Sequence, residues 1–271
     1  MGRGRMYFDL DELDIDIKKE IYFSYGMIFT YQGEDYYYKG NKTLSSIYNE
    51  ILAKKIADKL GISCCEYYLG SYFDDLGSVS KMISNDKFIS MSNLLLNSYG
   101  ITKNKNNIQD INTMFDNIFS FEISEKLKSD LLDIFLFDVL IGNCDRNSDN
   151  YGLILDDNPR FAPLFDNENM LSDYSIYYGN YTLGIDEDDL DDENIIDKLF
   201  ERNPQTKDRL KEMLPIISEE SLESIFKELE KEYEINKYIK EQVMDRFSIN
   251  REMIKKCLTR KVKKRWLNGK V

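Results

Sequence analysis

The stretch IGNCDRNSDNYGLIL, residues 141–155, places a dense group of Asp, Asn and Arg directly after a strongly apolar run. Shortly afterwards, the segment APLFDN adds an isolated carboxylate, Asp166. Asp145 is therefore followed after four residues by Asn150, and Asp166 comes later. Phosphoryl transfer needs a group that orients a hydroxyl and hard oxygen ligands that hold Mg²⁺. This spacing indicates that chemistry.

The segments on either side of this group strengthen the interpretation. Residues 127–142 are apolar on most faces, which predicts a buried helix that ends at Gly142. Residues 151–155 and 160–165 bracket DDNP and predict a hairpin, with Asp166 just after its second strand. Asp-x-x-x-x-Asn is common by chance, and Asp and Asn also favour turns. Between a buried helix and a hairpin, however, it has the spacing of a protein-kinase catalytic loop. Asn143 and Arg146 are expected to shape this loop.

The composition describes a packed globular protein. Of 271 residues, 42% are hydrophobic, and 19 Tyr and 15 Phe are far more than disordered chains carry. No apolar run has the length of a membrane span, and the N-terminus has no apolar signal core, so we expect a soluble, cytoplasmic protein without membrane contact. The spacing of the four cysteines matches neither a zinc site nor a disulfide framework, which predicts reduced thiols.

The charged residues restrict the chemistry and the partners. The chain has no histidine, which excludes imidazole bases, histidine-containing triads and imidazole metal sites. The net charge is −13, but it is unevenly distributed. Residues 251–271 contain nine basic residues and one acid, a net charge of +8, so the preceding residues carry a net charge of −21. Because binding to nucleic acid depends on neutralising phosphates, such binding is not expected of the acidic body. The basic tail could contact nucleic acid or an acidic partner, or lie against this body.

The part of the chain before residue 84 predicts strands around one helix. Residues 46–60 have apolar residues at helical spacing and are followed by a capping Gly61. The expected strands are 21–31, 35–39, 64–73 and 78–83. Later segments are largely helical, with an apolar stripe over residues 222–233.

Two residues in this first part match the nucleotide-contacting pair of a kinase. Lys39 ends a predicted strand and Glu50 lies in the following helix, in the order of the lysine and helix glutamate that position phosphates. Lys42 is close enough in sequence to be the relevant lysine instead. Glu50 could also pair with Lys54 at i, i+4 on an exposed helix face.

At these residues the chain resembles the HipA-like serine/threonine kinases, a bacterial branch of the protein-kinase-like fold. The matching segments are YYYKGN, YNEILAKKIADKLGISCCEYYLGSY, SVSKMI, LFDVLIGNCDRNSDNYGLIL and FAPLFDNENML, within residues 22–171. The resemblance implies an α+β protein of two lobes, with a β-rich lobe over residues 1–84 and a mostly helical lobe over 85–271. It also implies that ATP and Mg²⁺ bind between them.

The resemblance assigns roles to individual positions and implies transfer of the γ-phosphate to Ser or Thr of a protein substrate. The roles are Asp145 as catalytic aspartate, Asn150 and Asp166 as metal ligands, Lys39 and Glu50 as phosphate-binding pair, and Lys81, Met82 and Ile83 as hinge at the nucleotide. An antitoxin or another regulatory protein is the implied partner.

The chain departs from its relatives at three points. Many relatives have His where Asn147 stands, and Asn can also donate and accept hydrogen bonds. Only FSYG, residues 23–26, lies where a glycine-rich phosphate loop is expected. It contains Ser24, and some relatives autophosphorylate a serine there and lose activity. The length is short for a full HipA toxin, which favours a compact, core-only member.

Two other functions stay open. Phosphoinositide-type lipid kinases have a DRHNxN motif that DRNSDN partly matches, but Asn167 replaces the glycine that follows their metal-binding Asp. A pseudokinase or binding module would keep the fold without turnover, because the phosphate loop is weak.

Overall fold

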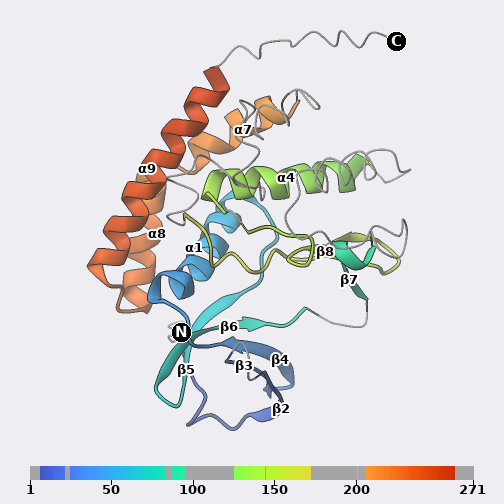
Figure 1. Cartoon of the computed structure of the whole chain (residues 1–271), viewed down its shortest axis with the longest axis vertical. Coiled ribbons are helices and arrows are strands. Elements are labelled where there is room, and N and C mark those ends of the chain that lie inside the picture. Colours follow the sequence, from blue (N-terminus) through green and yellow to red (C-terminus); the bar gives the residue numbers. More distant parts are fainter. Residues whose placement is uncertain are drawn as a thin grey trace, which may run out of the picture.

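The computed structural model describes residues 7–21, 25–83, 87–94, 125–143, 145–171, 200 and 205–259. Its strands and helices separate into a β-rich part at the bottom of Figure 1 and a helical part above it. The α+β fold class predicted from the sequence is confirmed.

The β-rich part is a six-stranded sheet in the order β1-β5-β6-β4-β3-β2. Its strands are β1 (Tyr7–Asp9), β2 (Asp16–Ile21), β3 (Gly26–Tyr31), β4 (Glu34–Lys39), β5 (Tyr67–Tyr72) and β6 (Asp75–Lys81). Neighbours pair antiparallel, except that β1 runs parallel to β5. One face of the sheet buries a cluster that includes Phe8, Phe29 and Tyr38. β4, which ends at Lys39, is therefore an inner strand that this core holds in place.

The prediction of one continuous strand over residues 21–31 is wrong. Ile21 is the last residue of β2, and Gly26 is the first residue of β3 and its antiparallel partner. The aromatic residues between them have high β propensity, so composition alone does not reveal the chain reversal. Tyr25 at this reversal has a positive φ of 48°. The remainder of the FSYG segment before it, including Ser24, lies outside the described residues.

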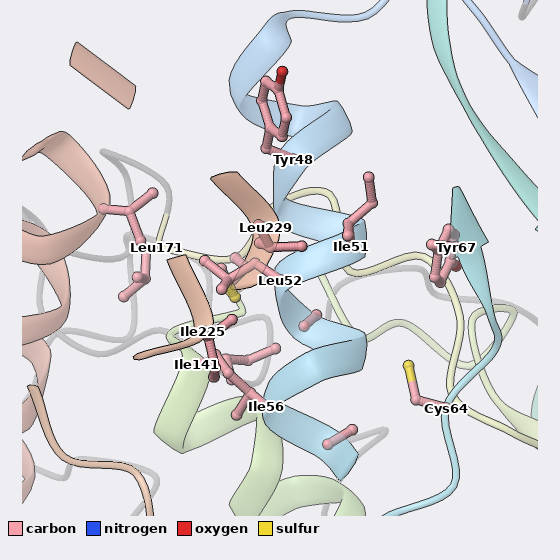
Figure 2. Close-up of a cluster of buried hydrophobic side chains, with 14 of the residues drawn as sticks. Tyr48, Ile51, Leu52, Ile56, Cys64, Tyr67, Ile141, Leu171, Ile225 and Leu229 are labelled. Atoms are coloured by element: carbon pink, nitrogen blue, oxygen red, sulfur yellow. The ribbon is translucent and has the colours of Figure 1, made fainter. Parts of the chain in front are cut away.

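Helix α1 (Leu44–Leu60) connects the sheet with the helical part. It begins earlier than predicted because the Thr43 side chain accepts a hydrogen bond from the Ser46 N–H and caps it. Its end at the left-handed Gly61 confirms the predicted cap. Figure 2 shows its apolar side chains, among them Leu52 and Ile56, packed with residues of other helices. This helix, which carries Glu50, is therefore rigidly held.

The helical part contains α4 (Glu125–Ile141), α7 (Gln205–Ile216), α8 (Glu219–Glu232) and α9 (Lys237–Thr259). A small antiparallel sheet joins β7 (Phe88–Ser90), β8 (Gly152–Ile154) and β9 (Arg160–Phe161) in that order. The predicted buried helix and the hairpin after it are confirmed as α4 and β8-β9. Gly142, just after α4, has a positive φ of 57°, which directs the chain into the loop that carries Asp145.

Some sequence features lie outside the described residues. These are the polar segment 97–112, the acidic run 186–193 and residues 260–271 of the basic tail. Among the helices that are described, none is both long and apolar enough to cross a membrane.

Candidate active site

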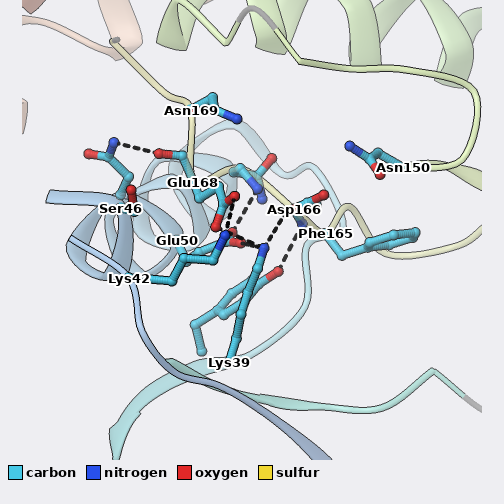
Figure 3. Close-up of polar contacts among 12 residues, drawn as sticks. Lys39, Lys42, Ser46, Glu50, Asn150, Phe165, Asp166, Glu168 and Asn169 are labelled. Carbon is cyan, nitrogen blue, oxygen red and sulfur yellow. Dashed lines mark hydrogen bonds and ion pairs between the residues drawn. The ribbon is translucent and has the colours of Figure 1, made fainter. Parts of the chain in front are cut away.

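Three carboxylates surround Lys39 at the end of β4 (Figure 3). Its Nζ lies 2.6 Å from Asp166 Oδ1, 2.9 Å from Glu168 Oε2 and 3.9 Å from Glu50 Oε1. The sheet supplies the lysine, α1 supplies Glu50, and the segment after β9 supplies the other two acids. Residues more than one hundred positions apart therefore meet at one ammonium group.

Glu50 is almost completely buried, and its two oxygens have different partners. Oε1 faces Lys39, and Oε2 accepts a hydrogen bond from the Asn167 N–H at 2.7 Å. Lys54 instead pairs with Asp58 at 2.6 Å and with Glu66. Of the two partners considered for Glu50, the structure therefore selects Lys39.

Burial and charge act in opposite directions on this cluster. Burial raises the pKa of Glu50 to about 7, although the Lys39 ammonium favours the ionised form. Burial by itself would lower the pKa of Lys39, but the carboxylates of Asp166, Glu50 and Glu168 outweigh it and raise that pKa above its ordinary value. Lys39 is therefore a firmly protonated cation.

Asp145 lies in the loop after α4, and two asparagine side chains hold its carboxylate. Asn147 Nδ2 donates to Oδ1 at 3.3 Å, and Asn169 Nδ2 donates to Oδ2 at 3.1 Å. Asn147 Oδ1 also accepts from the Asp149 N–H at 2.9 Å. Asn147 thus both donates and accepts, as expected at the position where many relatives have His. Asn169 was not identified from the sequence.

Asn150 packs back onto its own loop. Its Nδ2 donates to the Asp145 backbone carbonyl at 2.9 Å, and the residue is buried. This contact fixes the separation of two predicted site residues. Figure 3 shows Asn150 apart from the Lys39 cluster, and among the described residues no hydrogen bond joins its side chain to Asp166.

Arg146 connects the loop to the segment that carries Asp166. Its guanidinium makes two 3.0 Å contacts with Asp138 of α4. It also donates to the carbonyl of Asn150 at 3.0 Å and to the carbonyl of Phe165 at 2.5 Å. A buried cation thus fixes both segments to one helix, which is the loop-shaping role that the sequence predicts.

The backbone of Asp166 has an unusual conformation that a buried tyrosine supports. Asp166 has a positive φ of 59°, which is uncommon outside glycine. Its N–H donates to the hydroxyl of Tyr67 in β5 at 3.0 Å. Tyr67 was not identified from the sequence, where it is one of many aromatic residues in predicted strands.

The predicted hinge residues follow the end of the large sheet. Lys81 is the last residue of β6, and its Nζ forms a 2.9 Å ion pair with Glu34. The Met82 N–H donates to the Asp35 carbonyl at 2.8 Å. Among the described contacts, Lys81, Met82 and Ile83 are not part of the Lys39 cluster, so their contact with a nucleotide stays a prediction.

Glu168 also contacts Lys42, so it joins the two lysines that the sequence left as alternatives. Its Oε1 lies 3.0 Å from Lys42 Nζ, and its Oε2 contacts Lys39. Of the two lysines, Lys39 is the one that faces both Glu50 and Asp166. The sequence predicts no role for Glu168, because an acid two residues after Asp166 is not distinctive by itself.

The donor atoms suit a hard cation only together with further ligands. Asp166 offers a carboxylate and Asn150 a carboxamide, which are oxygen donors of the kind that Mg²⁺ prefers. Within the described ranges, no group of three or more Asp, Glu, Cys or His residues is placed to hold a metal. Protein-bound Mg²⁺ usually keeps waters and substrate phosphates as ligands, so a two-residue donor set fits this mode.

The chain has a protein-kinase-like fold. Its β-rich part holds a Lys–Glu pair, its helical part holds the Asp145 loop, and Asp166 lies at the lysine. Within this fold class, the chain resembles the HipA-like serine/threonine kinases, as its motifs predict. In sequence, 127 residues are 28% identical to the serine/threonine-protein kinase CtkA of Helicobacter pylori. This match covers 44% of the chain but only 38% of CtkA.

Solved structures extend the resemblance in fold. The crystal structure of CtkA, described as a proinflammatory kinase of H. pylori, has a TM-score of 0.70 at 20% identity and covers 94% of this chain and 98% of that one. HipA of Shewanella oneidensis, solved with HipB and its operator DNA, has a TM-score of 0.58 at 14% identity. That match covers 83% of this chain and 62% of HipA. No protein-family model matches the chain.

Proposed function

We propose that the protein is an ATP- and Mg²⁺-dependent kinase that transfers the γ-phosphate to Ser or Thr of a protein. The observation that carries this proposal is the contact of Lys39 with both Glu50 and Asp166. In kinases the lysine of such a pair positions nucleotide phosphates, and an adjacent aspartate holds the metal. The likeness in fold to CtkA and HipA gives further support.

Each residue has a distinct task in this proposal. Asp145 orients the substrate hydroxyl and accepts its proton, and Asn147 and Asn169 hold its carboxylate in place. Lys39 neutralises the charge that develops on the phosphates. Asn150 and Asp166 would hold Mg²⁺, which supplies charge neutralisation and alignment when bound. Arg146 keeps the loop and the Asp166 segment in register.

We propose that the nucleotide base binds at the hinge after β6, at Lys81, Met82 and Ile83. β6 ends at Lys81, and the next described strand, β7, pairs with β8 of the helical part. We therefore place the boundary between the lobes near residue 84 and the hinge at Lys81, Met82 and Ile83.

We also propose that the protein acts in the cytoplasm, because the reaction uses ATP.

The test is label transfer from γ-labelled ATP with Mg²⁺ to the protein itself and to lysate proteins. Asp145→Ala and Asp166→Ala should each reduce transfer by at least about a hundredfold without unfolding the protein. Asp157→Ala, in the hairpin after the loop, is the control and should retain transfer. Near-normal transfer by either site variant would refute the assignment.

The other functions left open by the sequence are outcomes of the same experiment. Binding of ATP and Mg²⁺ in a thermal shift, without transfer to any acceptor, would indicate a pseudokinase. Transfer to phosphoinositide vesicles but not to protein would indicate a lipid kinase.

A regulatory protein partner is proposed from fold likeness to HipA, which was solved with HipB and operator DNA. An antitoxin would be such a partner if this chain acts as a toxin. Co-purification of the chain with the product of an adjacent gene would test this, and growth arrest that its co-expression relieves would support the toxin role.

A further inference from the structure

The carboxylate of Glu168 bridges two lysines, with one oxygen on each. Oε2 lies 2.9 Å from Lys39 Nζ, and Oε1 lies 3.0 Å from Lys42 Nζ. Figure 3 shows the two lysine side chains converging on this acid. The side chain of Glu168 is only 17% exposed, so this is a partly enclosed ion cluster and not a surface pair.

The surrounding structure holds all three groups in place. Asn49 Nδ2 donates to the Glu168 carbonyl at 2.8 Å and to the Met170 carbonyl at 2.8 Å. Lys42 directly precedes Thr43, the N-cap of α1, and Lys39 ends β4. The end of β4 and the start of α1 thus bring the ammonium groups of Lys39 and Lys42 to the same carboxylate.

Two fixed ammonium groups that share an anion form a geometry that also suits a phosphate group. A phosphate, like a carboxylate, can place one oxygen on each cation, and lysine binds phosphate as a point charge. The carboxylate of Glu168 and a phosphate carry like charges, so they cannot occupy this position together at low cost. The chain also lacks the glycine-rich segment whose backbone N–H groups would otherwise hold phosphates.

We propose that Lys42 is a second nucleotide-phosphate-binding residue, and that Glu168 occupies the phosphate position between Lys39 and Lys42 until a nucleotide displaces it. Glu168 then acts as an internal competitor that sets the affinity for nucleotide phosphates. This inference rests on the proposed nucleotide-binding function and concerns how that site is regulated.

The test compares dissociation constants of adenosine, ADP and ATP with Mg²⁺, measured by calorimetry on the full chain. Lys42→Met should weaken ATP binding by about tenfold, since one charged contact is lost, and leave adenosine binding unchanged. Lys42→Arg should retain most of the ATP affinity because it keeps the charge. Lys55→Met is the matched control, since the Lys55 side chain is as exposed as that of Lys42, 31% in both, and pairs with Glu232 instead.

Glu168→Gln tests the competitor directly, and it removes charge with little change in shape. It should strengthen ATP binding by roughly threefold to tenfold, leave adenosine binding unchanged, and lose most of this gain at high salt. A purely structural role for Glu168 would instead change adenosine and ATP binding together, or weaken both.

The outcomes separate this inference from the function on which it rests. Unchanged ATP affinity in Lys42→Met, or no gain in Glu168→Gln, would overturn the inference while wild-type ATP binding leaves the kinase proposal intact. Failure of the wild-type protein to bind either ATP or adenosine would overturn both.

Discussion

Asp138 of α4 and Arg146 of the loop that carries Asp145 form a two-point ion pair whose side chains are both completely buried. The same guanidinium donates to the backbone carbonyls of Asn150 and Phe165. The pair therefore connects the helix, the Asp145 loop and the Asp166 segment in one hydrogen-bond network.

Removal of either member of this pair should destabilise the fold strongly. Asp138→Ala or Arg146→Ala should lower the free energy of unfolding by about 3–5 kcal/mol, because each leaves a buried charge without its partner. Arg146→Lys should not restore stability, since an ammonium cannot make two parallel contacts. Urea unfolding measures these changes.

The chain contains a control with the same geometry at the surface. Arg209 also makes two 2.9 Å contacts with Asp133, but its side chain is 44% exposed. Arg209→Ala should change the free energy of unfolding by about 1 kcal/mol or less. Equal losses for Arg209→Ala and Arg146→Ala would contradict the importance of burial.

The Tyr67 hydroxyl should be required to position Asp166. Tyr67→Phe removes the acceptor of the Asp166 N–H and should lower kcat for phosphate transfer, at a cost of about 1–3 kcal/mol in stability. Tyr48→Phe is the comparison, because the Tyr48 hydroxyl donates to the Glu234 carbonyl away from the site. If both variants lower kcat equally, the effect is general and Tyr67 does not position Asp166.

The two asparagines at Asp145 should affect turnover more than nucleotide binding. Asn147→Ala and Asn169→Ala should each lower kcat by up to about tenfold, since each frees one oxygen of the Asp145 carboxylate, the proposed proton acceptor. The KM for ATP should stay close to that of the wild type. Asn158→Ala in the β8-β9 turn is the control, and steady-state kinetics on all variants provides the measurement.

Glu50 should make stability fall as the pH rises towards neutrality. Burial raises its pKa from 4.5 to about 7, so the folded chain binds a proton more tightly than the unfolded chain between these values. The stabilisation is fully present below the unfolded pKa and is lost as the pH passes the folded pKa. Between pH 5 and pH 8 the wild type should lose roughly 2 kcal/mol relative to Glu50→Gln.

Urea unfolding of the wild type and of Glu50→Gln at both pH values measures this difference. All other titrating groups are present in both proteins, so their contributions to the pH dependence cancel. Parallel pH profiles for the wild type and Glu50→Gln would contradict a raised pKa at Glu50.

Local patterns were enough to predict several elements that carry the site. The apolar residues before Gly142 predicted α4, DDNP predicted the β8-β9 turn, and Gly61 predicted the end of α1. Helical periodicity, turn chemistry and caps involve residues within a few positions of one another, so the sequence displays them directly. The spacing from Asp145 to Asn150 is likewise a local feature that can be read directly from the sequence.

Contacts between distant segments could not be read in this way. The sequence left Lys39 and Lys42 as alternatives, and it gave no reason to select Tyr67 or Glu168. The pairing of β2 with β3 was missed because aromatic residues continue through the chain reversal. Each of these features depends on which strand lies beside which and on where a side chain is buried. Strand order and packing are settled by burial across the whole fold, whereas periodicity and capping are local.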